Sequence, residues 1–354
     1  MHNRTPIKGR GTPTAIANRY RRVERETVDD GWPRDDDVAP SPATQLIADP
    51  SRSVISYNES PDIPFDRSIN PYRGCEHGCI YCYARPTHAW LDFSPGIDFE
   101  TRIVYKPDAA KLLAAELARP GYRCAPMGLG TNTDPWQPAE RRLGITRQVL
   151  EVLEAHDHPV TCVTKSAGIE RDIDILGAMA ERRLALVHLS ITTLDAELSR
   201  RLEPRAAAPA RRLKAVERIA AAGIPVGVIV APVIPFINDD AIEHILEAAR
   251  AAGASHAHYI LVRLPLEVSP LFREWLDQHF PDRAARVMNR IRDMRGGADY
   301  RSGFGVRQRG EGVYAELIGT RFRKARARLA FGEEPSLDCS RFRVPGAAEQ
   351  LSLF

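Results

Sequence analysis

Residues 71–83 read PYRGCEHGCIYCY, a stretch that places three thiols, Cys75, Cys79 and Cys82, at C-x3-C-x2-C spacing. The spacing is short enough for one loop to bring all three thiols round a single inorganic centre. A structural zinc ion normally has four protein ligands, whereas an iron–sulfur cube held by three cysteines leaves one iron free to bind another group. The stretch therefore predicts an open iron–sulfur site, or a zinc site that a fourth ligand completes.

The residues on both sides of this loop are also informative. SPDIPFD at 60–66 and SINPYRGC at 68–75 precede it, CYARPTH at 82–88 follows it, and the aromatic Tyr81 stands just before the third thiol. Together these residues resemble the radical SAM superfamily and, within it, the bacterial group of spore photoproduct lyase, a DNA repair enzyme.

The resemblance implies that the three thiols bind a [4Fe–4S] cluster and that the free iron binds S-adenosylmethionine (SAM). In that family an electron from the cluster cleaves SAM to a 5′-deoxyadenosyl radical. The zinc alternative needs a fourth ligand, for which His77 and the distant Cys124 are candidates.

Composition indicates a globular enzyme. The chain has 354 residues, 44% of them hydrophobic, which is enough for one large domain or two modest ones. Its six cysteines are too few and too clustered for a secreted disulfide scaffold, and an open iron–sulfur site needs a reducing compartment, so we expect a cytoplasmic protein. No apolar run approaches the roughly 20 residues of a membrane span. The net charge of +3 is too small to indicate a nucleic-acid partner by itself.

From about residue 66, short apolar runs alternate with amphipathic segments of helical length. Such alternation predicts a parallel sheet with helices packed against it. The expected strands are a first strand before Cys75 and the runs 125–131, 159–164, 184–191, 224–231 and 256–262. The expected helices are 108–119, 140–156, 171–182, 210–222 and 239–252. These six units match the partial (β/α)6 barrel of the radical SAM family, an α/β fold.

Polar residues stand at the carboxyl ends of several expected strands, where open parallel barrels present their sites. The second strand ends in a Thr-Asn-Thr-Asp tip, the third in a lysine, and the fourth in hydroxyl residues. The tip is also a capped turn, and the lysine could be a surface-capping residue. The resemblance implies that the SAM contacts come from Tyr81, Tyr83, Thr131, Asn132, Lys165 and Ser190.

One position departs from the lyase group. When the chain is aligned with spore photoproduct lyase on the Asp-Pro pair, Thr131 stands where that enzyme has the cysteine that returns a hydrogen atom. A hydroxyl cannot easily replace a thiol in that role. Cys124 should lie at the opposite end of the barrel, Cys162 should face away from Lys165 by the two-residue period of a strand, and Cys339 is near no motif. Direct repair of the spore photoproduct is therefore not the expected reaction.

Histidines provide a further candidate. Alternation puts His256 and His258 on one face of the sixth strand, where they could form a metal pair or face the substrate together with Arg263. His188 in the fourth strand could be a ligand, a base or a hydrogen-bonded core histidine.

Four segments are expected. Residues 1–58 form an arm that is flexible or laid over the main domain, because they show little hydrophobic periodicity. Residues 59–265 form the barrel, 266–344 a mostly helical extension, and 345–354 a tail. The extension carries two basic groups, which could contact a phosphate backbone or be solvated helix faces: Arg283, Arg286 and Arg290, and Arg321, Arg323, Lys324, Arg326 and Arg328.

The chain stops at QLSLF, residues Gln350, Leu351, Ser352, Leu353 and Phe354. Two leucines and a phenylalanine on a polar tail suit a partner's groove, or else dock on the protein's own barrel. The pentapeptide resembles the bacterial motif that binds the DNA polymerase sliding clamp.

These observations predict a radical SAM enzyme that acts on DNA, receives its electron from a flavodoxin or ferredoxin, and is recruited by the sliding clamp. One alternative keeps the chemistry but changes the substrate to RNA or a peptide. The other is a non-catalytic iron–sulfur or zinc protein that binds DNA or the clamp as an adaptor.

Overall fold

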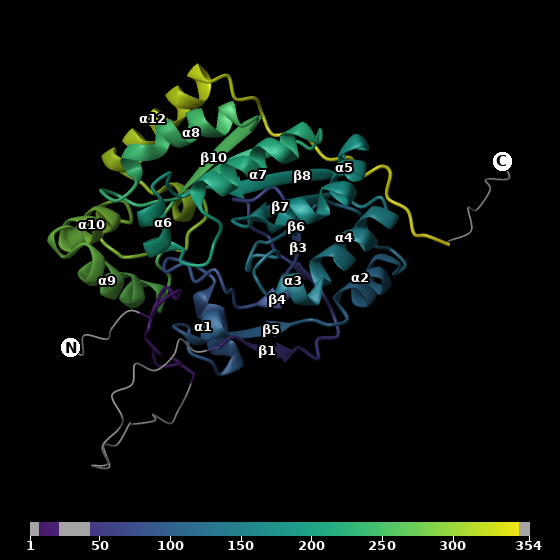
Figure 1. Ribbon diagram of the computed structural model, residues 1–354, viewed down its shortest axis with the longest axis horizontal. Coiled ribbons are helices and arrows are strands. Elements are labelled where there is room, and N and C mark those ends of the chain that lie inside the picture. Colours follow the sequence, from purple (N-terminus) through teal and green to yellow (C-terminus); the bar gives the residue numbers. More distant parts are fainter. Residues whose placement is uncertain (1–6, 21–42, 347–354) are drawn as a thin grey trace, which may run out of the picture.

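Six parallel strands form the centre of the computed structural model, which describes residues 7–20 and 43–346 (Figure 1). In sheet order they are β10 (His256–Leu261), β9 (Val226–Val233), β8 (Ala185–Ser190), β7 (Val160–Thr164), β6 (Met127–Leu129) and β3 (Arg67–Ile69). A short strand, β2 (Ile55–Tyr57), pairs antiparallel with β3 at one edge. Within the described ranges the two edges, β2 and β10, do not pair with each other, so the barrel is open. The predicted partial (β/α)6 architecture is confirmed.

The central strands are buried on both faces, which explains why they appear in the sequence as continuous apolar runs rather than alternating ones. All six residues of β8 are buried. Helices follow the strands and cover the outer face of the sheet (Figure 1). They are α2 (Ala109–Leu117), α3 (Glu140–Leu143), α4 (Ile145–Ala155), α5 (Ile173–Glu181), α6 (Ala196–Leu202), α7 (Pro209–Ala221) and α8 (Ile242–Ala251), with the 3-10 turns η2 (Ala167–Asp172) and η3 (Asp239–Ala241).

Two helices differ from the sequence prediction. The helix expected over 140–156 is divided in two at Gly144, whose φ of 64° is left-handed and ends α3 where α4 begins. Helix α6 was not predicted. It begins at Asp195, whose side chain accepts hydrogen bonds from the backbone of Glu197 and Leu198.

A second, smaller sheet lies beside the barrel, at the bottom of Figure 1. Its order is β1 (Gln45–Ala48), β5 (Arg102–Tyr105) and β4 (Tyr72–Arg73). The 3-10 helix η1 (Arg85–Leu91) and α1 (Asp98–Thr101) connect β4 to β5. Residues 45–48 and 55–57, within the segment predicted as an arm, thus form strands in both sheets.

The extension beyond the barrel is helical, with α9 (Val268–His279), α10 (Pro281–Asp293), α11 (Val306–Arg309) and α12 (Val313–Arg328). After α12 the chain runs without helix or strand over 330–346, which we call the C-terminal strap (yellow in Figure 1). Its backbone amides of Gly332, Asp338 and Arg343 donate hydrogen bonds to the carbonyls of Ser255, Arg183 and His156, respectively. Those carbonyls come just before β10, β8 and β7, so the strap crosses the amino ends of the strands.

The predicted clamp-binding residues, 350–354, lie outside the described residues. No helix in the described part of the chain is both long enough and apolar enough to cross a lipid bilayer.

Candidate active site

The three thiols lie together in the loop between β4 and η1, on the carboxyl side of β3. Cys75 and Cys79 are buried and Cys82 is half-buried. The amide of Cys75 donates to the carbonyl of Phe99 at 2.9 Å, and the loop needs Gly74 at a φ of 81°, where a Cβ would stand 2.8 Å from that same carbonyl. The loop is therefore folded tightly against the segment that leads into β5.

Arg85 organises the inside of this loop. Its fully buried guanidinium donates to the carbonyls of Cys79 at 3.0 Å and Gly78 at 3.3 Å, and it pairs with Glu100 at 2.5 Å. Glu100 also accepts from the amide of Gly11 at 2.8 Å, so the described part of the N-terminal segment closes over the loop. A buried arginine that donates to several carbonyls fixes the backbone of the loop in one geometry, because leaving any of these buried groups without a hydrogen bond would cost free energy.

The tip of the second strand supports the loop from the other side. Gln137, fully buried, accepts from the amide of Glu76 at 2.9 Å and donates to the carbonyl of Gly74 at 3.3 Å. Asp134 lies 3.4 Å from Nδ1 of His77 and accepts from the backbone amide of Lys165 at 2.8 Å. The Asp-Pro-Trp-Gln segment thus connects the thiol loop to the end of the third strand.

The number of thiols, rather than their spacing, distinguishes a zinc ion from an iron–sulfur cube. A structural zinc ion normally takes four protein ligands. The loop supplies three thiols, which suits a cube with one iron left free.

One of the two fourth-ligand candidates for zinc, Cys124, is engaged elsewhere. Burial raises the pKa of the Cys124 thiol, and the neighbouring thiol of Cys339 raises it further. The imidazole of His77 faces the carboxylate of Asp134. Burial raises the pKa of the thiols of Cys75, Cys79 and Cys82, so without a cation they stay protonated. A bound metal cluster would supply the positive charge that three thiolates need. The donor set and its burial therefore fit a [4Fe–4S] cluster.

Lys165 and Ser190, two of the predicted SAM contacts, meet beside this loop. Nζ of Lys165 donates to Oγ of Ser190 at 2.5 Å and lies 3.4 Å from the carbonyl of Ala231 at the end of β9. The same Nζ lies 5.8 Å from the ring centroid of Tyr81. Three strand ends and the thiol loop thus converge on one ammonium group.

Glu203, which the sequence analysis did not single out, completes this group. Its buried carboxylate accepts from the hydroxyl of Tyr81, pairs with the buried guanidinium of Arg212, and lies 3.8 Å from Nζ of Lys165. Burial alone would raise its pKa, but the charges of Arg212 and Lys165 outweigh burial and lower the pKa to about 2. Only the fold brings Glu203, which follows α6, under the thiol loop.

This ionised carboxylate should make stability depend on pH. Because its pKa is lowered on folding, its contribution is complete above about pH 4.5 and is lost as the pH falls towards about 2. A shift of this size corresponds to about 3 kcal/mol. We expect Glu203→Gln to lower the unfolding temperature at about pH 7, and to lose less stability than the wild type between about pH 5 and about pH 3.

Thermal unfolding followed by circular dichroism at these pH values measures the difference. The control is Glu217→Gln, because Glu217 is an exposed acid on α7 that pairs with Lys214. Equal losses in the wild type and in Glu203→Gln would show that Glu203 is not the group that titrates.

The remaining predicted residues, Tyr83, Thr131 and Asn132, form a second group at the carboxyl end. The Tyr83 hydroxyl donates to the carbonyl of Thr131, and the amide of Asn132 donates to Oδ1 of Asn70 at 2.9 Å. Asn70 also donates to Oγ1 of Thr131 at 3.3 Å, so it holds both tip residues in place. Asn70 belongs to the quoted motif, but its role was not predicted.

Other sequence candidates are divided between the two ends of the barrel. Arg263, just after β10, lies with its guanidinium carbon 4.0 Å from the ring centroid of Tyr83, so it remains a candidate for substrate contact. His256 opens β10 and therefore lies at the amino end of that strand, with His258 two residues further along. Cys162 is fully buried in the core between sheet and helices.

One of the two predicted basic groups is partly paired within the fold. Arg321 and Arg328 of α12 pair with Glu243 and Glu247 of α8, each at 2.6 Å, because the two helices pack side by side. Counting the pair of Arg326 with Glu333, three of the five cations in that group contact an acid. On α10, Arg286 instead lies 3.9 Å from the ring centroid of Phe236.

Comparison with known proteins agrees with this geometry. The family model described as "Radical SAM superfamily" matches residues 69–249. Uncharacterized proteins of Mycobacterium tuberculosis and Mycobacterium bovis are 37% identical over 226 residues, which cover 63% of this chain and 66% of theirs. The chain thus spans 66% of the length of these curated relatives.

Solved structures of spore photoproduct lyase share the fold. The lyase complexed with dinucleoside spore photoproduct superposes with a TM-score of 0.58 at 17% identity, covering 80% of this chain and 79% of that one. A variant with bound AdoMet and the same dinucleoside gives a TM-score of 0.57 at 16% identity, covering 80% of this chain and 78% of that one. Since the family model covers half of the sequence and includes the three-thiol loop, this chain belongs to the radical SAM superfamily.

Proposed function

We propose that this protein is a radical SAM enzyme that acts on DNA, repairing or modifying a lesion. The observation that carries the proposal is the thiol loop at the carboxyl ends of the parallel strands, with Lys165 and Ser190 beside it. Cys75, Cys79 and Cys82 would hold the [4Fe–4S] cluster. When bound, the cluster and SAM supply an electron and a 5′-deoxyadenosyl group, the source of a radical that abstracts hydrogen from the substrate.

Lys165 is suited to hold the carboxylate of SAM. Its neighbour Glu203 is already neutralised by Arg212, with which it forms a buried pair, so the charge of Lys165 is only partly used within the protein. The Lys165 side chain is 16% exposed, so its ammonium can reach a ligand. Ser190 fixes its position, and the carbonyl of Ala231 accepts from both side chains.

Replacement of Lys165 by methionine should weaken SAM binding about 10- to 100-fold, because a hydrogen bond to a charged group contributes about 1.5–3 kcal/mol. Equilibrium dialysis of SAM with the reconstituted protein measures this. The control is Lys214→Met, since Lys214 is an exposed lysine on α7 that pairs only with Glu217 among the described residues. Unchanged SAM affinity in Lys165→Met would remove Lys165 from the site.

A DNA substrate is supported by two observations. The structural neighbours are bound to a dinucleoside photoproduct. In this chain Tyr83 is 42% exposed at the carboxyl end and stacks with Arg263, a pair that suits an unstacked base and its phosphate. Anaerobic turnover with DNA deuterated in its nucleotides should transfer deuterium into 5′-deoxyadenosine. Transfer from labelled RNA or peptide, and none from DNA, would favour the alternative substrates.

The reaction should differ from that of spore photoproduct lyase. The hydroxyl of Thr131, which stands in the position of that enzyme's cysteine, accepts a hydrogen bond from Asn70. Cys124 precedes β6, which begins at Met127, and Cys162 is fully buried in the core between sheet and helices. We infer that the substrate radical is quenched differently, or that the product is not a simple restored pyrimidine pair.

The C-terminal pentapeptide, Gln350 to Phe354, is proposed to recruit the enzyme to the DNA polymerase sliding clamp. Deletion of these five residues should abolish binding to the clamp in surface plasmon resonance, while formation of 5′-deoxyadenosine is unchanged, because none of the proposed cluster or SAM ligands is among them. A truncated chain that still binds with the affinity of the full chain would reject recruitment by this motif.

The competing proposal is a non-catalytic adaptor that keeps the cluster only for structure. Anaerobic reconstitution with iron, sulfide, dithionite and SAM, followed by chromatography for 5′-deoxyadenosine, separates the two. A flavodoxin or ferredoxin should replace dithionite as electron donor. An intact cluster with bound SAM and no 5′-deoxyadenosine would support the adaptor.

A further inference from the structure

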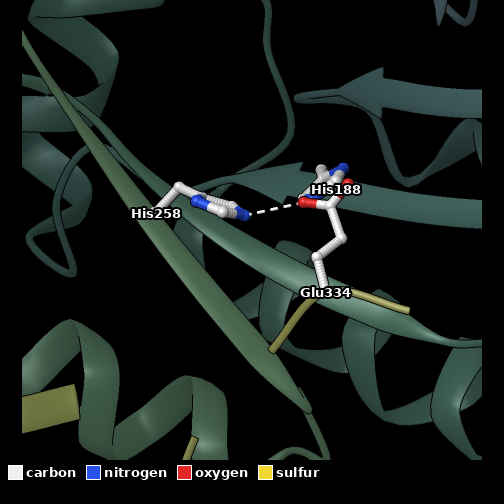
Figure 2. Close-up of side chains that lie close together, drawn as sticks. All are labelled: His188, His258 and Glu334. Atoms are coloured by element: carbon white, nitrogen blue, oxygen red, sulfur yellow. Dashed lines mark hydrogen bonds and ion pairs between the residues drawn. The ribbon is translucent and has the colours of Figure 1, made fainter. Parts of the chain in front are cut away.

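Three side chains from distant parts of the chain converge at the amino end of the barrel, away from the thiol loop (Figure 2). His188 comes from β8, His258 from β10 and Glu334 from the C-terminal strap. Oε2 of Glu334 lies 2.8 Å from Nε2 of His258 and 3.2 Å from Nε2 of His188. All three ligand atoms lie within 4.8 Å of one another.

A fourth side chain, His256, approaches the same point because of the strand register. His188, Gly227 and His256 are direct partners across β8, β9 and β10, so their side-chain positions form one row. Gly227 in the middle has no side chain, and a Cβ there would overlap the imidazole of His256. The two rings therefore meet above Gly227, with their Nε2 atoms 3.1 Å apart.

These distances match the coordination shell of a zinc ion. Zinc binds imidazole nitrogen and carboxylate oxygen at about 2.0–2.2 Å in a tetrahedron, which places neighbouring ligand atoms about 3.4 Å apart. The observed separations between Glu334 and the two histidines fall close to that value, so small side-chain movements would complete the shell. Nitrogen and oxygen ligands without sulfur also suit zinc in preference to softer metals such as copper(I).

Hydrogen bonds within the protein do not satisfy this group. Nε2 of His188 faces both Glu334 and Nε2 of His256, but in a neutral ring it carries at most one proton and cannot satisfy both. A cation at the centre would instead accept the lone pairs of His188, His258 and Glu334 together.

We propose that His188, His258 and Glu334 bind a zinc ion, with His256 or a water molecule as the fourth ligand. The ion would join the C-terminal strap to the inner face of the barrel, because Glu334 is the ligand that does not come from a strand. His188 lies on the same face of β8 as Ser190, two residues nearer the amino end. The ion would therefore hold the barrel together on the amino-terminal side of the proposed SAM site.

Zinc measured by mass spectrometry in the full-length, cluster-reconstituted protein tests the proposal. The wild type, exposed to Zn²⁺ and then freed of excess metal, should retain about one zinc per chain beside its iron. His258→Ala and Glu334→Gln should each weaken retention about 10-fold or more, while His244→Ala, which removes an exposed histidine from α8, should not. A chain with all three loop cysteines replaced by alanine should keep this zinc.

Titration with Co²⁺ gives a second measurement, which does not depend on the variants folding well. The zinc-free wild type should develop the visible absorption of a four-coordinate cobalt site, and added Zn²⁺ should remove it. Failure of the wild type to bind either metal would overturn the proposal. So would zinc that persists in His258→Ala and Glu334→Gln but disappears with the loop cysteines.

Discussion

Replacing any one of Cys75, Cys79 and Cys82 by alanine should remove the iron–sulfur cluster and lower 5′-deoxyadenosine formation by about 100-fold or more. The expectation follows from the burial of the loop: few other ligands can enter a site that Arg85 and Gln137 hold closed. Loss of a group that only positions a metal ligand already costs about 10- to 100-fold in metal affinity or activity, so loss of a ligand should cost at least as much. Iron content and chromatography after anaerobic reconstitution measure the two effects.

The matched control is Cys339→Ala. Cys339 is half-buried like Cys82 but lies beside Cys124, away from the loop. It should keep its iron and its activity. Full iron content in all three loop variants, or a loop that holds zinc and no iron in the oxygen-free protein, would contradict the assignment of the site.

Replacing Arg212 by methionine should destabilise the protein by about 3–5 kcal/mol, the usual effect of removing one partner from a buried ion pair. Glu203 would then remain buried with only Lys165, 3.8 Å away, as a charged neighbour. In thermal unfolding this should lower the midpoint by roughly 4–7 °C. The Tyr81 hydroxyl, which donates to Glu203, should also lose its fixed position, so SAM binding should weaken.

The adjacent residue on the same helix is the control. Arg211 pairs with Glu170 at the surface, where Arg218 also contacts Glu170 at 2.5 Å, so Arg211→Met should change stability by about 0–1 kcal/mol. The double variant Arg212→Met with Glu203→Met should regain part of the lost stability, since no fully buried charge is left unpaired. Equal effects of Arg211→Met and Arg212→Met would mean that the buried pair is not important for stability.

The strand and helix pattern could be predicted because each element depends on its local sequence. Apolar runs such as 184–191 and 224–231 allow strands buried on both faces, and β8 (185–190) and β9 (226–233) form there. The third-strand lysine, Lys165, could be singled out because an ammonium at the end of a buried strand needs a partner. Its partner Glu203 could not, because a glutamate after a short helix looks like a solvated residue until the fold buries it.

Charge pairing between elements was equally invisible in the sequence. The basic run of α12 suggests a phosphate-binding face, yet α8 packs beside it and supplies Glu243 and Glu247. Alternation placed His256 and His258 on one face of a strand, but neither the row across Gly227 nor the approach of Glu334 follows from spacing.

By itself, then, the sequence determined the thiol loop, the alternation of strands and helices, and the residues at the strand ends, because these depend on short-range spacing and on the two-residue period of a strand. Only the tertiary structure decided which charges are buried together and that the C-terminal strap reaches the amino end of the barrel. The physical reason is that burial and pairing energies depend on side chains far apart in the chain, such as Lys165, Glu203 and Arg212, and local patterns carry no information about their distance.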